Sequence, residues 1–283
     1  MARNNQARRP STKGTKAAKT NETTASPSSL PFVTPTQFID LPSQGRFYGE
    51  NHPLHNQDTV EIHYMTARDE DILTSQTLLK KGVAMERFLE NILVNKKIKP
   101  DKLVIGDRNA ILVGARITGY GSDYTTQVVC GNCASKVTHS FDLNEMKVYN
   151  GDNLKDVKVT PTDDGTFLTT LPLTKLEAEL RLMTGADEAS IAQQVSNNKK
   201  KKALESNLTT QLARSIVSLA GETDKNIIKK FIEVMPAYDS RHLRSVYRSI
   251  MPTIDLTQDF ECPECATEQK MEVPFTVDFF WPN

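Results

Sequence analysis

Apolar and polar residues change their spacing several times along the chain, and each spacing predicts a different kind of element. Between residues 59 and 65, Val60, Ile62 and Tyr64 alternate with more polar side chains, which predicts a β-strand with one buried face. Residues 32–58 place scattered apolar side chains among proline, glycine and asparagine, a pattern typical of short strands and tight turns. We therefore expect the ordered structure to begin with short strands.

From residue 66 to residue 121 the apolar positions change to helical spacing. Gly82 is expected to divide the first part of this stretch into two helices. Asp107 is expected to cap a later helix, which Gly119 and Gly121 would end. The apolar residues that carry the helical pattern are Ile72, Leu78, Leu79, Val83, Phe88, Leu89, Ile92, Leu93, Ile111, Leu112, Ala115 and Ile117.

Residues 146–252 predict a β-hairpin followed by several helices. Asp164 and Gly165 mark the turn of the hairpin. Thr174 and Glu177 have the spacing of a capping box, which predicts that a helix begins there. The helices expected in this part cover residues 174–185, start near residue 187, cover residues 204–219, start at Asp224, and run from Asp239 to just before Pro252.

Two C-x-x-C pairs lie between predicted strands, and together they hold all four cysteines of the chain. CGNC contains Cys130 and Cys133, and CPEC contains Cys262 and Cys265. Two such turns supply the tetrahedral four-sulfur shell that structural zinc prefers, so we expect the four cysteines to bind one zinc ion. An iron–sulfur cluster uses the same ligands, and two reduced pairs or a disulfide are further alternatives. A shell of four sulfurs leaves no position for water or substrate, which predicts a structural site.

These elements together predict an α+β fold. We expect a mainly helical body with short N-terminal strands and a zinc-ribbon-like module of four cysteines, whose two knuckles are split by a long helical insertion. The expected parts are a disordered basic tail over residues 1–31, strands and helices over 32–121, the split zinc ribbon over 122–145 and 253–281, and the hairpin with the helical insertion over 146–252.

Charge is balanced over the 283 residues, with a formal net charge of +0 at pH 7, but it is unevenly placed. Lys199, Lys200, Lys201 and Lys202 form the sharpest basic run outside the N-terminal tail. We interpret this run as a solvated turn between helices, and a nucleic-acid contact is the alternative. The tail is interpreted as flexible, since it lacks the interleaved aromatic residues of a nucleic-acid-binding arm. Its charged residues are Arg3, Arg8, Arg9, Lys13, Lys16, Lys19 and Glu22.

Motifs that predict catalysis or membrane insertion are missing from the sequence. The five histidines are scattered, and none of HExxH, GxxxxGK[ST], GxGxxG or GxSxG occurs. No apolar run approaches the roughly 18 residues of a transmembrane helix. We therefore expect a protein that is not an enzyme and has no membrane partner.

Two smaller clusters have simpler interpretations than metal binding. His139 could replace a cysteine as a metal ligand, but four cysteines already suffice and a histidine on a strand surface is the simpler interpretation. Asp69, Glu70 and Asp71 could bind a cation, yet the helix dipole already favours acids in a first helical turn.

Several phrases in the sequence resemble a known family. They are LPSQGRFYGENHPL, EIHYMTARDEDILTSQTLLKKG and KIKPDKLVIGDRNAILVGARITGYGSDY, followed by the CGNC turn. Over roughly residues 38–145 the chain resembles the baseplate hub assembly family of T4-type contractile-tailed bacteriophages. The resemblance implies a tail protein that is made in the cytoplasm of the infected bacterium and helps to build the central hub of the baseplate. It also implies other hub or tail subunits as partners, and it leaves open whether the protein stays in the virion and whether it forms homo-oligomers.

A zinc-ribbon factor that binds nucleic acid or regulates transcription is the alternative function. The basic tail and the four-lysine run could contact phosphates. The balanced net charge argues against it, because nucleic-acid-binding domains are usually basic. The second cysteine turn also has acidic neighbours that repel phosphate: Asp259, Glu261, Glu264 and Glu268.

Overall fold

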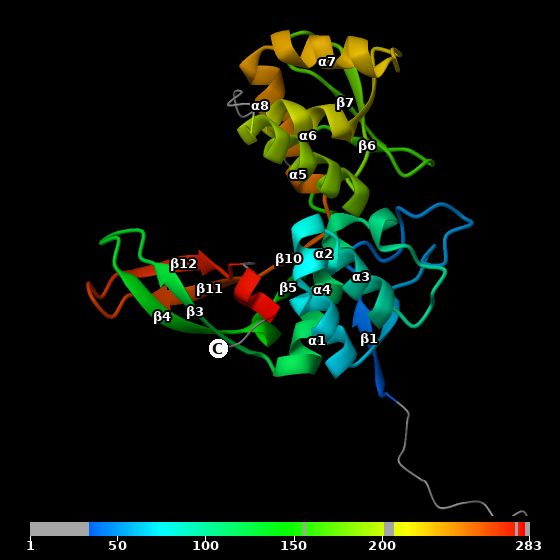
Figure 1. Cartoon of the computed structure of the whole chain (residues 1–283). Helices are drawn as coiled ribbons and strands as arrows, with labels where there is room; N and C mark the ends of the chain where they lie inside the picture. The colour runs from blue at the N-terminus through cyan, green and yellow to red at the C-terminus, as the bar shows by residue number, and fades with distance from the viewer. Residues whose placement is uncertain (1–33, 155–156, 201–206, 275–276, 281–283) are drawn as a thin grey trace, which may run out of the picture. The chain divides into compact units, whose positions relative to one another are not determined.

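The structure, a computed structural model of the chain, describes residues 34–154, 157–200, 207–274 and 277–280. Within these residues, the strands form four two-stranded sheets and one four-stranded sheet. Figure 1 shows how helices and strands are arranged. The α+β class predicted from the sequence is confirmed. The expected basic tail over residues 1–31 lies outside the described residues.

The N-terminal strands β1 (Thr36–Asp40) and β2 (Thr59–His63) pair in an antiparallel sheet. Val60 and Ile62 are buried at alternate positions of β2, as predicted. Tyr64, the third residue of the predicted pattern, lies just after the strand and is 38% exposed, so its predicted burial is wrong. Tight turns connect the two strands. Gly45 has a φ of +69°, and a side-chain carbon there would lie 2.3 Å from the carbonyl oxygen of Leu54, so the turn requires glycine.

Four α-helices and a short 3₁₀ helix follow β2. Gly82, with a φ of +70°, ends one helix and separates it from the next, as predicted. The stretch before Gly82 holds two helices and not the predicted one, because the helical backbone also breaks at Ser75. Gly121 ends the last of them, also as predicted, whereas Gly119 lies inside that helix against Met65. The elements are α1 (Ala67–Thr74), α2 (Gln76–Lys81), α3 (Ala84–Ile92), η1 (Pro100–Lys102) and α4 (Ile105–Tyr120).

The predicted cap at Asp107 is wrong, because α4 begins at Ile105 and Asp107 is fully buried inside its first turn. Its carboxylate accepts hydrogen bonds from the backbone N–H of Ser43 (2.9 Å), the hydroxyl of Ser43 (2.5 Å) and the hydroxyl of Tyr48 (2.6 Å). The Tyr48 oxygen in turn accepts from the backbone N–H of Val104 (3.1 Å). Burial raises the pKa of Asp107, and it also raises the pKa of Tyr48. Asp107 thus ties the turns after β1 to the start of α4.

Two β-hairpins lie side by side in the fold although they are far apart in the sequence. The first contains β3 (Asp123–Val129) and β4 (Lys136–Asp142), and the second contains β11 (Thr257–Glu261) and β12 (Glu268–Glu272). Figure 1 shows the two hairpins beside each other. After the 3₁₀ helix η2 (Leu143–Glu145), strand β5 (Lys147–Tyr149) pairs with β10 (Thr253–Asp255). The chain therefore leaves the hairpins and returns to them at one place.

The described residues between β5 and β10 contain an antiparallel four-stranded sheet, with strand order β6-β7-β8-β9, and four helices. The predicted hairpin with its turn at Gly165 is confirmed as β6 and β7. The part is therefore not only helical. Its elements are β6 (Thr160–Pro161), β7 (Phe167–Thr170), β8 (Glu177–Leu180), α5 (Gly185–Lys200), α6 (Asn207–Ser215), β9 (Ile216–Leu219), α7 (Lys225–Val234) and α8 (Ala237–Ile250).

Two of the predicted helices in this part are wrong. The helix expected over residues 174–185 is strand β8, because Ala178, Leu180 and Leu182 are buried at alternate positions and the backbone pairs with β7 and β9. Gly185 consequently starts a helix instead of ending one. The helix expected over residues 204–219 gives way to β9 after Ser215.

The last two helices of this part are close to the prediction. Asp224 caps α7, as predicted, by accepting from the backbone N–H of Asn226 (2.7 Å). α8 starts at Ala237, and Asp239 lies in its first turn. The buried Asp239 carboxylate accepts from the backbone N–H groups of Leu173 (2.7 Å) and Thr174 (3.0 Å) and from the Thr174 hydroxyl (2.8 Å). Thr174 therefore binds α8 and does not cap a helix of its own.

A buried arginine anchors the C-terminal 3₁₀ helix η3 (Val277–Phe280) to the end of α4. Arg116 donates to the backbone carbonyls of Phe279 (2.8 Å), Gly121 (2.8 Å) and Asp123 (3.2 Å). Phe279 and Phe280 are buried beside it. This contact fixes η3 at the root of the first cysteine hairpin. None of the described helices is both long and apolar enough to span a membrane.

Candidate metal centre

The two C-x-x-C turns have the same backbone geometry. In the first, the N–H of Cys130 donates to the carbonyl of Ser135 (3.0 Å), and in the second the N–H of Cys262 donates to the carbonyl of Thr267 (3.1 Å). The alanine after each second cysteine has a positive φ, +58° at Ala134 and +52° at Ala266. This common geometry has a sequence signal beyond the cysteines, which is the shared pattern C-x-x-C-A-[ST].

The fold brings all four cysteine sulfurs together. They lie within 4.8 Å of one another, and the Cys130–Cys265 and Cys133–Cys262 sulfur distances are both 3.8 Å. A tetrahedral zinc ion with zinc–sulfur bonds of about 2.3 Å separates its sulfurs by about 3.8 Å. All four cysteines are free, so the disulfide alternative is wrong. The sulfur positions fit a four-cysteine metal shell.

The four thiols have different surroundings. Cys130 and Cys262 are buried, Cys265 is half-buried and Cys133 is exposed. Burial raises the pKa of Cys262 to about 11, whereas hydrogen bonds from the side chain and backbone of Thr267 lower the pKa of Cys265 to about 6. Hydrogen bonds from Ser135 also lower the pKa of Cys133. Cys133 and Cys265, the two less buried cysteines, thus favour the thiolate form that binds metal.

Three contacts hold the two hairpins against each other around the sulfurs. Asn132 donates from Nδ2 to the hydroxyl of Thr267 (3.0 Å) and lies 3.7 Å from the sulfur of Cys265. Further along, the side-chain amide of Gln258 accepts from the backbone N–H of Asp142 (3.1 Å) and donates to its carbonyl (2.6 Å). Neither Asn132 nor Gln258 could be identified from the sequence, because each contact joins residues more than a hundred positions apart.

His139, the third contact, is not part of the sulfur cluster. Its ring makes edge-on contacts with Phe141 of its own strand (centroids 4.6 Å apart) and with Phe260 of the other hairpin (5.1 Å), and the second contact packs one hairpin on the other. The simpler interpretation of His139, a structural histidine of the strand, agrees with this placement.

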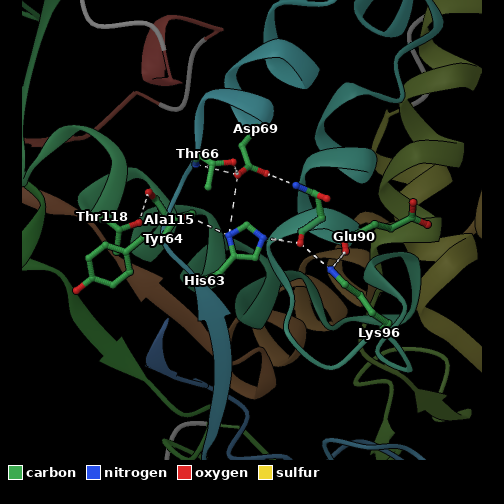
Figure 2. A network of polar contacts seen from close by, with 9 residues as sticks. His63, Tyr64, Thr66, Asp69, Glu90, Lys96, Ala115 and Thr118 are labelled. Atoms are coloured by element: carbon green, nitrogen blue, oxygen red, sulfur yellow. Dashed lines mark hydrogen bonds and ion pairs between the residues drawn. The ribbon is translucent and has the colours of Figure 1, made fainter. Parts of the chain in front are cut away.

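Asp69, the first residue of the acidic run in α1, has a structural role, and Figure 2 shows its network of polar contacts. Asp69 is buried, and it accepts hydrogen bonds from the backbone N–H (2.9 Å) and hydroxyl (2.6 Å) of Thr66 and from Asn91 Nδ2 (2.6 Å). The backbone carbonyl of Asn91 lies 2.7 Å from both His63 Nε2 and Lys96 Nζ. This network joins β2, α1 and the end of α3, so Asp69 has a role without a cation.

The basic run is only partly described. The backbone of Lys199 and Lys200 belongs to α5, so the expected turn between helices does not begin before Lys201. Lys201 and Lys202 lie outside the described residues. Near the second cysteine turn, the acidic residues Asp259, Glu261, Glu264 and Glu268 are all exposed, which makes this surface unfavourable for phosphate.

A family model covers both cysteine turns and the strands that carry them. No match was found among curated proteins or among solved structures. The family model is described as T4 bacteriophage base plate protein, and it matches residues 35–281, most of the chain. The chain therefore belongs to the T4 bacteriophage base plate protein family.

Proposed function

We propose that this protein acts in assembly of the central hub of the baseplate, through contacts with other tail subunits and without catalysing a reaction. Membership of the baseplate family suggests a structural protein of the phage tail. The proposal adds the hub as the place of action and the cytoplasm of the infected host as the place of assembly. In the same proposal, the protein becomes part of the baseplate of the virion.

The same proposal assigns a structural zinc ion to Cys130, Cys133, Cys262 and Cys265. The observation that carries it is the cluster of four free sulfurs within 4.8 Å, contributed by two hairpins. Four sulfur ligands leave no open coordination position, so the ion would hold the hairpins together and take no part in a reaction. In this proposal residues 122–145 and 253–281 form one zinc-ribbon-like module, and residues 146–252 are an insertion into it.

Exposed apolar side chains support a role in protein–protein contacts. Phe38 on β1 is 68% exposed, Val234 at the end of α7 is 77% exposed and Tyr238 on α8 is 63% exposed. Val234 and Tyr238 lie four positions apart where α7 ends and α8 begins, and exposed apolar side chains that gather in patches are common at subunit interfaces. They would serve as contacts for neighbouring subunits.

The test is complementation of a phage that lacks this gene. We expect wild-type protein to restore hubs, and Cys130→Ser and Cys265→Ser each to lose most of the bound metal and most hub assembly. Glu264→Gln, an exposed change in the same turn as Cys265, serves as the matched control and should leave both unchanged. Normal hub assembly by metal-free cysteine variants would reject the structural role of the ion.

Metal analysis of the purified protein separates the two candidate cofactors. Zinc at one ion per chain, with no visible absorption, supports the proposal. Iron with inorganic sulfide and visible absorption would replace zinc by an iron–sulfur cluster in the same shell. Strongly salt-dependent binding of the metal-loaded protein to duplex DNA, without entry into hubs, would instead support the nucleic-acid-binding function.

A further inference from the structure

A groove of about 310 Å³ lies between α6 and α8. None of its lining residues belongs to a cysteine turn. Four aliphatic side chains line the groove, Met183, Leu208, Leu212 and Met251, together with the ring of Tyr247. Leu208 is 39% exposed, so part of this lining is open to solvent. Methionine side chains adapt their shape to different partners, which suits a binding surface.

Two arginines line the same groove one helical turn apart. Arg244 and Arg248 are exposed residues of α8, and neither forms an ion pair with any carboxylate of the described residues. Among the described carboxylates, two that flank the groove elements in sequence, Asp187 and Asp239, have other partners. Asp187 binds Arg181 through two hydrogen bonds (2.7 and 2.8 Å), and Asp239 is buried by the loop that contains Thr174.

The groove therefore offers two free positive charges beside an apolar floor. Arginine forms strong paired hydrogen bonds with carboxylates, and a few well-packed residues, arginine among them, carry most of the binding energy at protein interfaces. Acidic residues four positions apart on a helix have side chains about 5–6 Å apart, which matches the spacing of Arg244 and Arg248 on α8. A nucleic acid would use the arginines but would gain little from the four apolar side chains.

We propose that this groove docks an acidic amphipathic helix of another baseplate subunit. A leucine-like side chain of the partner fills the space above Leu212, and two carboxylates of the partner pair with Arg244 and Arg248. This inference rests on the proposed function and names the chemistry of the partner surface.

The first test is charge reversal in the full-length protein. Each other baseplate subunit of the same phage is purified, labelled and titrated with wild-type protein and with Arg244→Glu/Arg248→Glu. We expect one subunit to bind wild type and to lose at least about tenfold affinity with the double variant, because like charges then face each other. Arg241→Glu, on the same helix but outside the groove lining, is the matched control and should bind like wild type. Unchanged circular dichroism melting of both variants shows that the fold is intact.

The second test identifies what occupies the groove in the assembled hub. A photo-cross-linking amino acid replaces Gln211, an exposed residue of the groove rim. The proposal is supported if the cross-linked peptide comes from another baseplate subunit and contains aspartate or glutamate beside a large apolar residue. It is overturned by a cross-link to residues 201–206 of the same chain, by a cross-link to nucleic acid, or by no cross-link.

The two proposals fail in different ways. If wild-type protein does not enter hubs at all, the proposed function fails. If wild type enters hubs and Arg244→Glu/Arg248→Glu enters equally well, only the groove proposal fails. Failure of every purified subunit to bind wild type, despite normal hub entry, also overturns the groove proposal.

Discussion

The sulfur of Cys130 lies 3.8 Å from the sulfur of Cys265, although 135 positions of chain separate the two residues. Neither hairpin supplies more than two of the four sulfurs, so a metal shell needs both hairpins at once. Closing a long loop has a large entropic cost, which a metal ion at the junction can offset. The strength of this junction is the first property to test.

We expect removal of the metal to destabilise the whole body. A structural zinc site contributes several kcal/mol, and each kcal/mol shifts the Tm of a chain of this size by about 2–4 °C, so a strong chelator should lower Tm by about 10 °C. Differential scanning calorimetry with parallel metal analysis measures this. Glu264→Gln should respond to the chelator like wild type. An unchanged Tm after loss of the metal would contradict the prediction.

The alanine that follows each cysteine pair predicts an unusual response to glycine. Ala266 has a φ of +52°, where glycine is less strained than alanine, so Ala266→Gly should raise the free energy of unfolding by roughly 0.5–1 kcal/mol. Ala266→Val should lower it and weaken metal binding, because a branched side chain fits this backbone poorly. As a control, Ala189→Gly inside α5 should lower the free energy of unfolding by about 1 kcal/mol. Urea unfolding measures all three, and a loss in Ala266→Gly would refute the strain argument.

The buried Asp107 cluster predicts a stability cost for a small change. Tyr48→Phe removes the hydrogen bond to Asp107 and leaves the backbone N–H of Val104 without its partner. The expected loss is about 1–3 kcal/mol in the free energy of unfolding. Tyr238→Phe, at a tyrosine that is 63% exposed, should change it by less than about 0.5 kcal/mol. Equal unfolding curves for the two variants would show that the cluster adds nothing to stability.

Asp239 predicts a pH dependence of stability. Burial alone would raise the pKa of the Asp239 carboxyl. Hydrogen bonds from Leu173 and Thr174 have the larger effect together and lower this pKa below its usual value. A carboxylate with a lowered pKa stabilises the fold above the unfolded pKa of about 3.9, and this contribution is lost as the pH falls through the folded pKa.

Asp239→Asn should therefore cost about 2–3 kcal/mol at pH 6 and progressively less as the pH falls below about 4. Urea unfolding of wild type and variant at several pH values gives the difference between them. Glu233→Gln, an exposed change on α7, is the control and should follow the wild-type pH profile. A wild-type–Asp239→Asn difference that stays constant with pH would rule out a role for the Asp239 charge.

A close backbone contact predicts that one glycine cannot be replaced. A side-chain carbon on Gly106 in α4 would lie 2.0 Å from the carbonyl oxygen of Pro252, just before β10. Gly106→Ala should lower the free energy of unfolding by about 2 kcal/mol, because backbone on both sides must shift. Gly49→Ala meets nothing within 4 Å and should be tolerated. Thermal melts of the two variants decide this, and a wild-type melt for Gly106→Ala would contradict the close packing.

The sequence predicted elements whose signals are local. Alternation around Val60, the glycines at positions 82 and 121, and the cap at Asp224 all depend on neighbouring residues, and the structure confirms them. The cysteine cluster was predictable for another reason, because matched C-x-x-C pairs have few uses other than a common metal site.

Elements that depend on distant partners could not be predicted in the same way. The stretch before Gly185 fits helical spacing through Leu176, Leu180 and Met183, but it also alternates, and pairing with β7 and β9 decides for a strand. The buried Arg116 has backbone carbonyls as partners, including that of Phe279, 163 positions away. No pattern within a short window reveals such a contact.

The separation of the two cysteine turns also affects how the protein is made. When Cys133 leaves the ribosome, another 129 positions of chain must be synthesised before Cys262 can join it. At typical rates of 5–20 residues per second this interval is on the order of ten seconds. During that time the first hairpin carries only two of the four thiols of the metal shell. The rate of translation, and not metal supply alone, therefore sets when the two hairpins can bind one ion.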